Sequence, residues 1–159
     1  MQEEFPYRID WALPKEWPEA MQMIWKTYLK FEAGDYTEEG IRNFFEFVTD
    51  DGLYQSFLRG SYKLLLAHDG DRIVGAASMR NCNYLSLLFV DEEYHRRGIG
   101  RRLMDCLCDY LKRTTDATEI VLRAAPYAIG FYERIGFTKI REEEQIAGIR
   151  VTPMKKPLF

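Results

Sequence analysis

The stretch from Tyr84 to Leu111 constrains the fold more than any other part of the chain. It begins with a short apolar run, residues 84–90, that has the length and composition of a β-strand. A turn with Gly98 and Gly100 follows, and then a long amphipathic run. The apolar residues of that run have the spacing of one helix face: Ile99, Leu103, Leu107, Tyr110 and Leu111. The stretch therefore predicts a strand, a glycine turn and a helix, in that order.

This order of elements places free backbone N–H groups at the positive end of a helix, beside arginines, which suits a phosphate or diphosphate. On this stretch alone, a purely structural turn is an equal alternative. A Walker-type site is excluded, because no Gly-Lys-Ser/Thr follows the glycines. A dinucleotide-binding Rossmann unit is also disfavoured, because Arg101 stands at the third glycine position. Arginine itself is compatible with phosphate, since its planar fork binds phosphate oxygens.

Two motifs resemble those of the GNAT superfamily of acyl-CoA-dependent N-acyltransferases. The first, His95-Arg-Arg-Gly-Ile-Gly100, is similar to the family's pyrophosphate loop Gln/Arg-x-x-Gly-x-Gly/Ala, although His95 departs from the usual first residue. The second runs from Arg123 to Phe137 and ends in Phe-Tyr-x-x-x-Gly-Phe, similar to the family's next strand and helix. The resemblance is strong over residues 62–155 and loose before them.

Hydrophobic patterning predicts strands over residues 7–12, 62–68, 72–79, 84–90, 119–124, 137–141 and 149–155. The Asp69-Gly-Asp71 turn indicates an antiparallel hairpin. A helix separates strands 84–90 and 119–124, so these two are expected to be parallel, with a right-handed crossover. The last two strands are expected to form a hairpin across residues 142–148.

Helices are expected on both sides of these strands. Pro14 begins the first, Gly34 ends it, and Thr37 caps a second. Residues 50–52 are predicted as a turn before a short helical piece, and Pro126 begins the last helix. With the resemblance, the expected fold class is α/β (α+β): a mixed central sheet of about seven strands, with an antiparallel N-terminal meander and a splayed parallel pair. We expect one GNAT domain over residues 1–159.

Composition excludes several classes of protein. Of the 159 residues, 47% are hydrophobic, and the net charge is −3 without an extended basic run, so nucleic-acid binding has little support. No apolar run approaches membrane-spanning length and no signal peptide opens the chain, which predicts a cytoplasmic protein without a membrane partner. Three cysteines without a signal sequence are expected to stay reduced. Two distant histidines and poorly placed cysteines predict no metal site.

The resemblance implies an acetyl-CoA site in the wedge between strands 84–90 and 119–124. Pantetheine amides would pair with backbone groups of Leu88, Phe89 and Val90, and the pyrophosphate would rest on N–H groups of residues 96–101. One or two of the arginine side chains at 96, 97, 101 and 102 are expected to touch phosphate. The implied cofactor-binding residues are Leu88, Phe89, Val90, His95, Arg96, Arg97, Gly98, Ile99, Gly100, Arg101 and Tyr132.

Tyr132 matches the family tyrosine near the CoA sulfur, and it is the predicted catalytic residue. A phenol of pKa about 10 and a thiol of about 8.5 are close enough for proton transfer. Packing on the apolar helix face is the alternative explanation for this aromatic. An N–H near Phe89 or Val90 would polarise the thioester carbonyl. No general base stands out; Glu32, Glu92 and Ser86 are the possible participants.

The loop between the first two helices, residues 32–36, commonly forms a wall of the acceptor site in the resembling family. Its acidic and aromatic residues are candidates to receive a cationic or polar acceptor, although a solvated loop is the simpler interpretation. Arg123 lies near the position where related sequences often have asparagine, and it would replace that side chain or bind an anionic acceptor. The substrate-binding candidates are Glu32, Tyr36, Ser86, Arg123 and Tyr127, with Asp35 in the same loop.

The predicted function is an acetyl-CoA-dependent N-acetyltransferase that acts on a primary amine by direct attack in a ternary complex. The acceptor class stays open between a small molecule, a peptide N-terminus and a lysine. A non-catalytic acyl-CoA-binding sensor or regulatory module is the alternative. A homodimer is also open, with Phe44, Phe47 or Phe159 as exposed interface residues.

Overall fold

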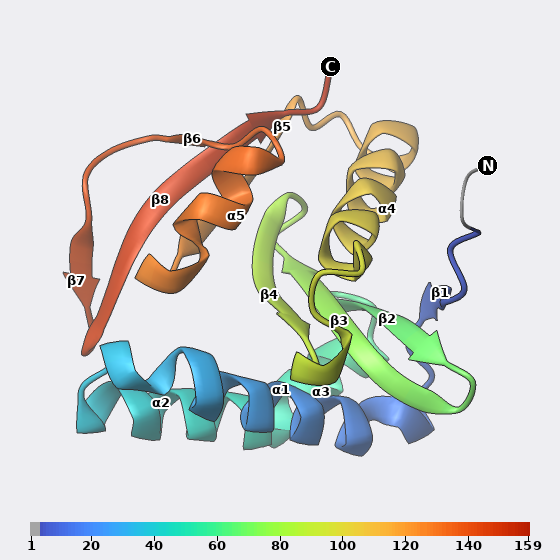
Figure 1. The fold of residues 1–159 in the computed structure, drawn as a ribbon, viewed down its shortest axis with the longest axis horizontal. Coiled ribbons are helices and arrows are strands. Elements are labelled where there is room, and N and C mark those ends of the chain that lie inside the picture. Colours follow the sequence, from blue (N-terminus) through green and yellow to red (C-terminus); the bar gives the residue numbers. More distant parts are fainter. Residues whose placement is uncertain (1–3) are drawn as a thin grey trace.

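A mixed sheet with helices on both faces forms the centre of the computed structural model, which describes residues 4–159 (Figure 1). Within those residues the sheet has eight strands in the order β1-β2-β3-β4-β5-β8-β6, and β7 pairs with β8. The strands are β1 (Arg8–Trp11), β2 (Lys63–Asp69), β3 (Arg72–Arg80), β4 (Tyr84–Val90), β5 (Glu119–Ala124), β6 (Thr138–Lys139), β7 (Glu144–Ile146) and β8 (Ile149–Pro157). This mixed α/β arrangement confirms the predicted fold class.

The helices fall into two groups (Figure 1). One group, α1 (Trp17–Phe31), α2 (Glu38–Thr49) and α3 (Asp51–Leu58), covers one face of the sheet. The other group, α4 (Ile99–Thr114) and α5 (Ile129–Arg134), covers the opposite face. Short 3-10 turns precede or join them: η1 (Pro14–Glu16), η2 (Ala33–Asp35), η3 (Glu92–Tyr94) and η4 (Pro126–Ala128). No helix among the described residues is both long enough and apolar enough to cross a bilayer.

Each face of the sheet has its own hydrophobic core. Under α4 and α5, Ile99, Leu103 and Leu107 pack against strand residues such as Leu122. Helix α4 lies close to the sheet because Gly75 has no side chain: a Cβ there would come within 3.0 Å of Ile99 Cγ2. Under α1 and α2, the second core is rich in aromatic and branched residues: Trp17, Ile24, Tyr28, Phe44, Leu87 and Phe89.

Strands β4 and β5 separate soon after they meet. They are parallel, and within residues 4–159 they pair at one position, Tyr84 with Val121. The β3–β4 ladder, in contrast, continues from Arg80 to Gly75, with a register shift between Ser78 and Met79. That shift leaves one extra residue, Ser86, on β4. The end of β4 therefore has one edge that β5 does not cover.

Two local expectations are wrong, and a third is confirmed only in part. Residues 50–52 begin α3, because the Asp50 side chain accepts a hydrogen bond from Gly52 N (3.0 Å) and caps the helix. Strand β6 is much shorter than residues 137–141. The last two predicted strands do pair antiparallel, as β6 with β8. The segment between them contains a further strand, β7, which joins β8 through Ala147 and Gly148, whose φ angles of 51° and 81° fit a tight turn. Thr37 does cap α2, as predicted, by accepting a hydrogen bond from Gly40 N (3.1 Å).

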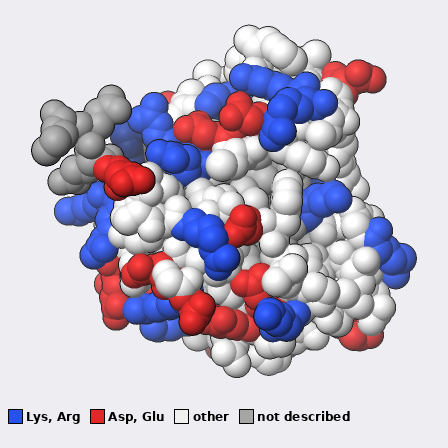
Figure 2. All heavy atoms as spheres, turned by 90° about the vertical axis from the view of Figure 1, so that its right-hand side faces the viewer, with Lys and Arg blue, Asp and Glu red and all other residues white. Residues whose placement is uncertain are grey.

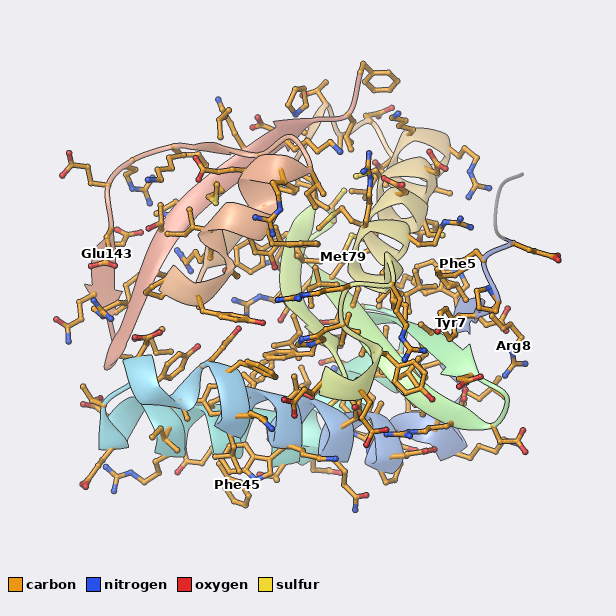
Figure 3. The ribbon with its side chains drawn as sticks, in the orientation of Figure 1. Phe5, Tyr7, Arg8, Phe45, Met79 and Glu143 are labelled. Atoms are coloured by element: carbon orange, nitrogen blue, oxygen red, sulfur yellow. The ribbon has the colours of Figure 1, made fainter. Side chains whose placement is uncertain are left out.

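The aromatic residues proposed as an interface differ in exposure. Phe44 is buried and Phe47 is half-buried, so the predicted exposure of both is wrong. The exposed aromatic on α2 is Phe45, which points away from the sheet (Figure 3). Phe159 is 86% exposed. On the face shown in Figure 2, basic and acidic side chains are interspersed rather than gathered into areas of one sign. The homodimer stays a prediction.

Candidate active site

The first of two neighbouring cavities lies where β4, the turn before α4 and α5 come together. We call it the α4 cavity; its volume is about 540 Å³. Ten of the eleven residues predicted to bind the cofactor line it: Leu88, Phe89, Val90, His95, Arg96, Gly98, Ile99, Gly100, Arg101 and Tyr132. The exception is Arg97. Residues far apart in the sequence therefore converge on one space.

The N-terminus of α4 opens into this cavity without a capping side chain. Gly98 occupies the N-cap position with φ 78°, a left-handed conformation that glycine adopts without strain, and no side chain accepts its neighbours' amides. The first turn of α4 contains no acidic residue, and Arg101 and Arg102 follow instead. Positive side chains are unfavourable at the positive end of a helix dipole, and a bound anion would compensate both charges. The arrangement is suited to bind an anion.

The four arginines around this turn take different directions. Arg96 and Arg101 line the α4 cavity. Arg97 donates a hydrogen bond to the Tyr7 hydroxyl (3.0 Å), and its guanidinium lies 5.0 Å from the centroid of the Tyr94 ring. Arg102 lies 4.2 Å from the centroid of the Phe5 ring. Phe5 and Tyr7 come from the N-terminal segment beside α4 (Figure 3). The side chains of Arg96 and Arg101 are thus the ones placed to contact a ligand.

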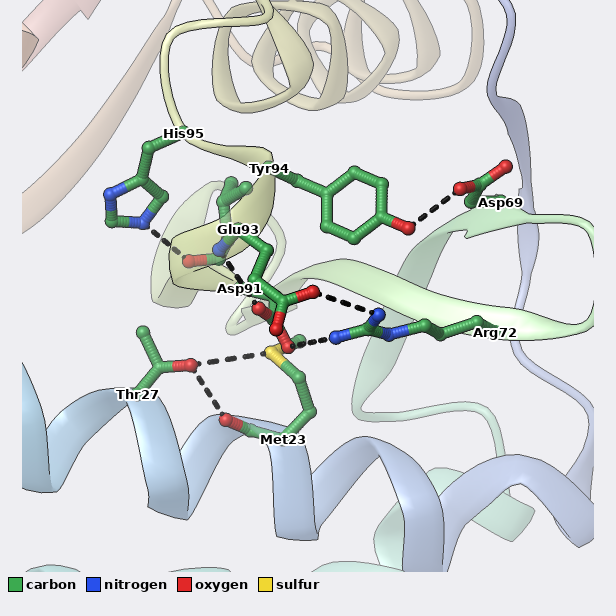
Figure 4. A network of polar contacts seen from close by, with 9 residues as sticks. Met23, Thr27, Asp69, Arg72, Asp91, Glu93, Tyr94 and His95 are labelled. Atoms are coloured by element: carbon green, nitrogen blue, oxygen red, sulfur yellow. Dashed lines mark hydrogen bonds and ion pairs between the residues drawn. The ribbon is translucent and has the colours of Figure 1, made fainter.

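His95 is bonded to the backbone of the strand before it. Its Nε2 lies 2.6 Å from the Val90 carbonyl oxygen (Figure 4). Because a carbonyl can only accept, Nε2 carries the proton. The nonstandard first residue of the loop motif therefore ties the loop to the end of β4.

Backbone directions along β4 correct one part of the predicted cofactor contacts. The Asp91 N–H donates to the Val74 carbonyl (2.9 Å), so the backbone groups of Asp91 point toward β3. Alternation then turns Phe89 toward β3 as well, while Leu88 and Val90 face the uncovered edge. Phe89 cannot offer its N–H to a ligand there, and the Val90 carbonyl is already bonded to His95. The backbone groups that remain available to a ligand at this edge are the N–H and C=O of Leu88 and the N–H of Val90.

The second cavity lies on the α2 side of the same strands. We call it the α2 cavity; its volume is about 260 Å³. Four of the five predicted substrate-binding residues line it, namely Glu32, Tyr36, Ser86 and Arg123. The fifth, Tyr127, lines the α4 cavity instead, where its ring stacks on Phe31 with centroids 5.4 Å apart.

One wall of the α2 cavity is a clamp between the α1–α2 connection and the β7–β8 turn. The Thr37 N–H donates to the Gly148 carbonyl (3.0 Å), and Arg150 forms an ion pair with Asp35 (2.9 Å). Tyr36 and Ile149 add an isolated antiparallel bridge. Asp35, predicted to receive the acceptor, is therefore used in this clamp. Tyr36, Ala147 and Ile149 of this clamp line the cavity.

The two cavities meet at residues that line both: Glu32, Leu88, Phe89, Ala128 and Tyr132. Two of these carry ionisable side chains. Desolvation, with a smaller effect from the Asp35 charge, raises the pKa of Glu32 to about 7, and the Tyr36 hydroxyl partly offsets the rise. Desolvation and then the Glu32 charge raise the pKa of the buried Tyr132 hydroxyl well above its usual value. This junction therefore holds an acid that titrates near neutrality beside a phenol that keeps its proton.

The other two base candidates are less well placed. Glu92 forms an ion pair with Lys30 and lines neither cavity. Ser86 lines the α2 cavity, but its oxygen accepts a hydrogen bond from the Tyr62 hydroxyl (3.2 Å).

Sequence reasoning missed several lining residues. In the α2 cavity these include Arg80, Tyr84, Phe44 and Phe47. Alternation along β3 contained a usable signal for Arg80, because Ala76, Ser78 and Arg80 share one face. The contributions of Ile146, Ala147, Ile149 and Val151 depend on the β7–β8 hairpin, which the sequence did not reveal.

Comparisons with known proteins identify the family. The family model described as an acetyltransferase (GNAT) domain matches residues 32–158. The chain belongs to the GNAT acetyltransferase family. The motif at residues 95–100, which resembles the family's pyrophosphate loop, forms one wall of the α4 cavity, and the Phe-Tyr-x-x-x-Gly-Phe motif brings Tyr132 to the junction.

Solved GNAT structures share this fold. A GCN5-related N-acetyltransferase from Rhodopseudomonas palustris superposes with a TM-score of 0.83 at 22% identity, covering 99% of this chain and 98% of that chain. The PaiA N-acetyltransferase from Thermoplasma acidophilum, in complex with coenzyme A, gives 0.80 at 18% identity, covering 95% and 98%. A spermidine N-acetyltransferase from Vibrio cholerae, in complex with CoA and spermine, gives 0.68 at 14% identity, covering 96% of each chain. No curated protein sequence matches the chain. At these identities the GNAT structures establish the fold alone.

Proposed function

We propose that this GNAT chain is an acetyl-CoA-dependent N-acetyltransferase that transfers the acetyl group to a primary amine by direct attack in a ternary complex. The observation that carries the proposal is the junction: Glu32 and Tyr132 line both cavities. A donor in one cavity and an acceptor in the other would meet at these two side chains. Direct transfer needs such a meeting point.

The α4 cavity has the features that a coenzyme A diphosphate and pantetheine require. The uncapped amides of residues 98–101 and the side chains of Arg96 and Arg101 would hold the diphosphate. The free backbone groups of Leu88 and Val90 would pair with the pantetheine amides in the manner of an added strand. GNAT structures with coenzyme A bound, such as that of the Thermoplasma protein, share this fold.

Glu32 is suited to accept a proton from the incoming ammonium group. Bound acetyl-CoA would supply the acetyl group as a thioester, whose transfer to an amine leaves a thiolate. A carboxylate of ordinary pKa is a weak base, whereas a pKa of about 7 brings Glu32 close to the value that general-base catalysis favours near neutral pH. The side chain would act in its ionised form.

Tyr132 is suited to hold a proton for the leaving sulfur. Part of the rise in its pKa comes from the negative charge of Glu32. When Glu32 takes the proton of the amine, that charge disappears and the Tyr132 hydroxyl becomes more acidic. The two proton movements would therefore be coupled: accepting one at Glu32 favours donating one at Tyr132. The second proton of the attacking nitrogen would return to Tyr132 as the C–S bond breaks, so that the products are the amide, the thiol and protonated Glu32.

The test is acetyl-CoA turnover across a panel of primary amines, with wild type compared with Tyr132→Phe and Glu32→Gln. We expect wild type to acetylate at least one amine and both variants to lose most of the rate while still binding coenzyme A. Coenzyme A binding without turnover on any amine would favour the alternative, a non-catalytic acyl-CoA-binding module.

A further inference from the structure

Two arginines from different strands enclose one tyrosine in the α2 cavity. Arg80, the last residue of β3, has its guanidinium carbon 5.0 Å from the centroid of the Tyr84 ring, and that of Arg123 on β5 lies 5.8 Å from the same centroid. All three residues line the cavity. The Tyr84 ring therefore holds two positive charges at the wall of the space that we assign to the acceptor.

Strand alternation explains why both arginines reach this face. Ile120, Leu122 and Ala124 of β5 belong to the core under α4 and α5, so Arg123 points to the opposite face. Met79 belongs to that same core, which turns Arg80 the same way. Strands β4 and β5 pair where Tyr84 lies, which keeps the arginine pair together.

Neither arginine has a carboxylate partner. Among residues 4–159, no acidic side chain forms an ion pair with Arg80 or Arg123, although other arginines such as Arg72 and Arg150 do form them. The acidic residue that lines the α2 cavity is Glu32, at the junction. The cavity lining thus contains one carboxylate, at the junction, and two guanidinium groups without an ion-pair partner.

We propose that the acceptor is an amino acid with a free carboxylate, whose amine lies at Glu32 and Tyr132 and whose carboxylate is bound by Arg80 and Arg123. This inference rests on the proposed function and names the class of its substrate. Guanidinium groups bind carboxylates through paired hydrogen bonds. A polyamine would instead bring several positive charges against the two arginines, which costs binding free energy.

The size and the remaining lining of the cavity narrow the class further. A volume of about 260 Å³ suits a molecule of amino-acid size. Phe44, Phe47, Ile149 and Val151 add apolar surface to the same cavity. An amino acid with an apolar side chain, such as phenylalanine or leucine, therefore fits best.

Matched acceptors test the role of the carboxylate. Rates would be compared for phenylalanine, phenylalanine amide, 2-phenylethylamine and spermidine at saturating acetyl-CoA. We expect kcat/KM for phenylalanine to exceed that for its amide by about tenfold or more, the effect of losing one charge-assisted pair. Arg80→Met and Arg123→Met should reduce that ratio toward one, and Arg123→Lys should restore part of it. Arg113→Met, on the exposed end of α4, is the matched control and should leave the ratio unchanged.

Failure of this inference can be told apart from failure of the proposed function. If the enzyme acetylates the amide, the simple amine or spermidine as well as it acetylates phenylalanine, the acceptor class is wrong while the function stands. If no amine is acetylated, the proposed function fails. Calorimetric titration of phenylalanine and of its amide into the coenzyme A complex then tests the carboxylate site by itself. Tighter binding of phenylalanine would support that site, and equal affinities would overturn it.

Discussion

The carboxylate of Glu32, at the end of α1, and the hydroxyl of Tyr132, on α5, are electrostatically coupled across the junction of two cavities. After desolvation, the charge of Glu32 is the largest cause of the raised pKa of Tyr132. Neither residue is near the other in sequence; the sheet between their helices brings them together.

Replacing Tyr132 with phenylalanine should remove the proton donor and keep the packing. The ring lies against Phe131 and Phe137 with centroids 5.3 and 5.4 Å away, and phenylalanine preserves both contacts. We expect kcat to fall about a hundredfold, the usual scale for a lost general acid, with coenzyme A affinity nearly unchanged. Tyr110→Phe, which keeps the ring packed on Trp11, is the control. A normal rate in Tyr132→Phe would show that this aromatic serves packing alone.

The pH dependence should report the titration of Glu32. Its ionised form is the active base, so kcat/KM should rise with pH and level off above the pKa of about 7. Activity is accordingly lost as pH falls through that value. In Glu32→Gln this limb should be absent and the rate at high pH should be much lower. A limb that persists in the variant would assign the titration to another group.

The clamp of the α2 cavity should be sensitive to the size of residue 148. A Cβ on Gly148 would come 2.1 Å from Thr37 Oγ1 and 2.8 Å from Gly40 N, and the φ of 81° is already strained for other residues. Gly148→Ala should raise KM for the amine and lower stability by about 1–3 kcal/mol.

Gly70→Ala is the matched control for that change. Gly70 also has a positive φ, 59°, but its Cβ would meet open space. The Gly70→Ala variant should have a lower free energy of unfolding, because alanine is strained at this φ, and an unchanged KM for the amine. Equal kinetic effects of the two substitutions would contradict a role for the clamp in acceptor binding.

Two neighbouring arginines should differ in their effect on coenzyme A affinity. Arg101 lines the α4 cavity, whereas Arg97 is held by Tyr7 and Tyr94. Calorimetry should show about a tenfold or greater loss of affinity in Arg101→Met, since a charge-assisted contact to phosphate is worth about 1.5–3 kcal/mol. Arg97→Met should change affinity much less. A larger loss of affinity in Arg97→Met than in Arg101→Met would mean that residues 95–100 rearrange when coenzyme A binds.

Most of the fold could be predicted because its signals are local. The hairpin at Asp69 to Asp71, the helix after Gly98 and the cap at Thr37 each depend on a few adjacent residues. The same is true of the loop motif, whose residues form one wall of the α4 cavity. Local patterning predicted the elements around the α4 cavity, and the family resemblance indicated which of their residues line it.

The α2 cavity depends on contacts between distant segments. Ile149 and Val151 enter the α2 cavity because the β7–β8 turn docks on Thr37, and nothing near residues 142–148 indicates that partner. The coupling of Glu32 to Tyr132 likewise follows from the packing of α1 and α5 on opposite faces. The direction of the Phe89 backbone could not be predicted either, because it depends on the extra residue at Ser86.

The most direct test of the account is a crystal structure of the protein with coenzyme A. We predict that the diphosphate rests on the amides of residues 98–101 and that the sulfur reaches the junction, within about 3.5 Å of the Tyr132 hydroxyl. A diphosphate bound away from the start of α4, or a sulfur directed away from both Tyr132 and Glu32, would contradict it.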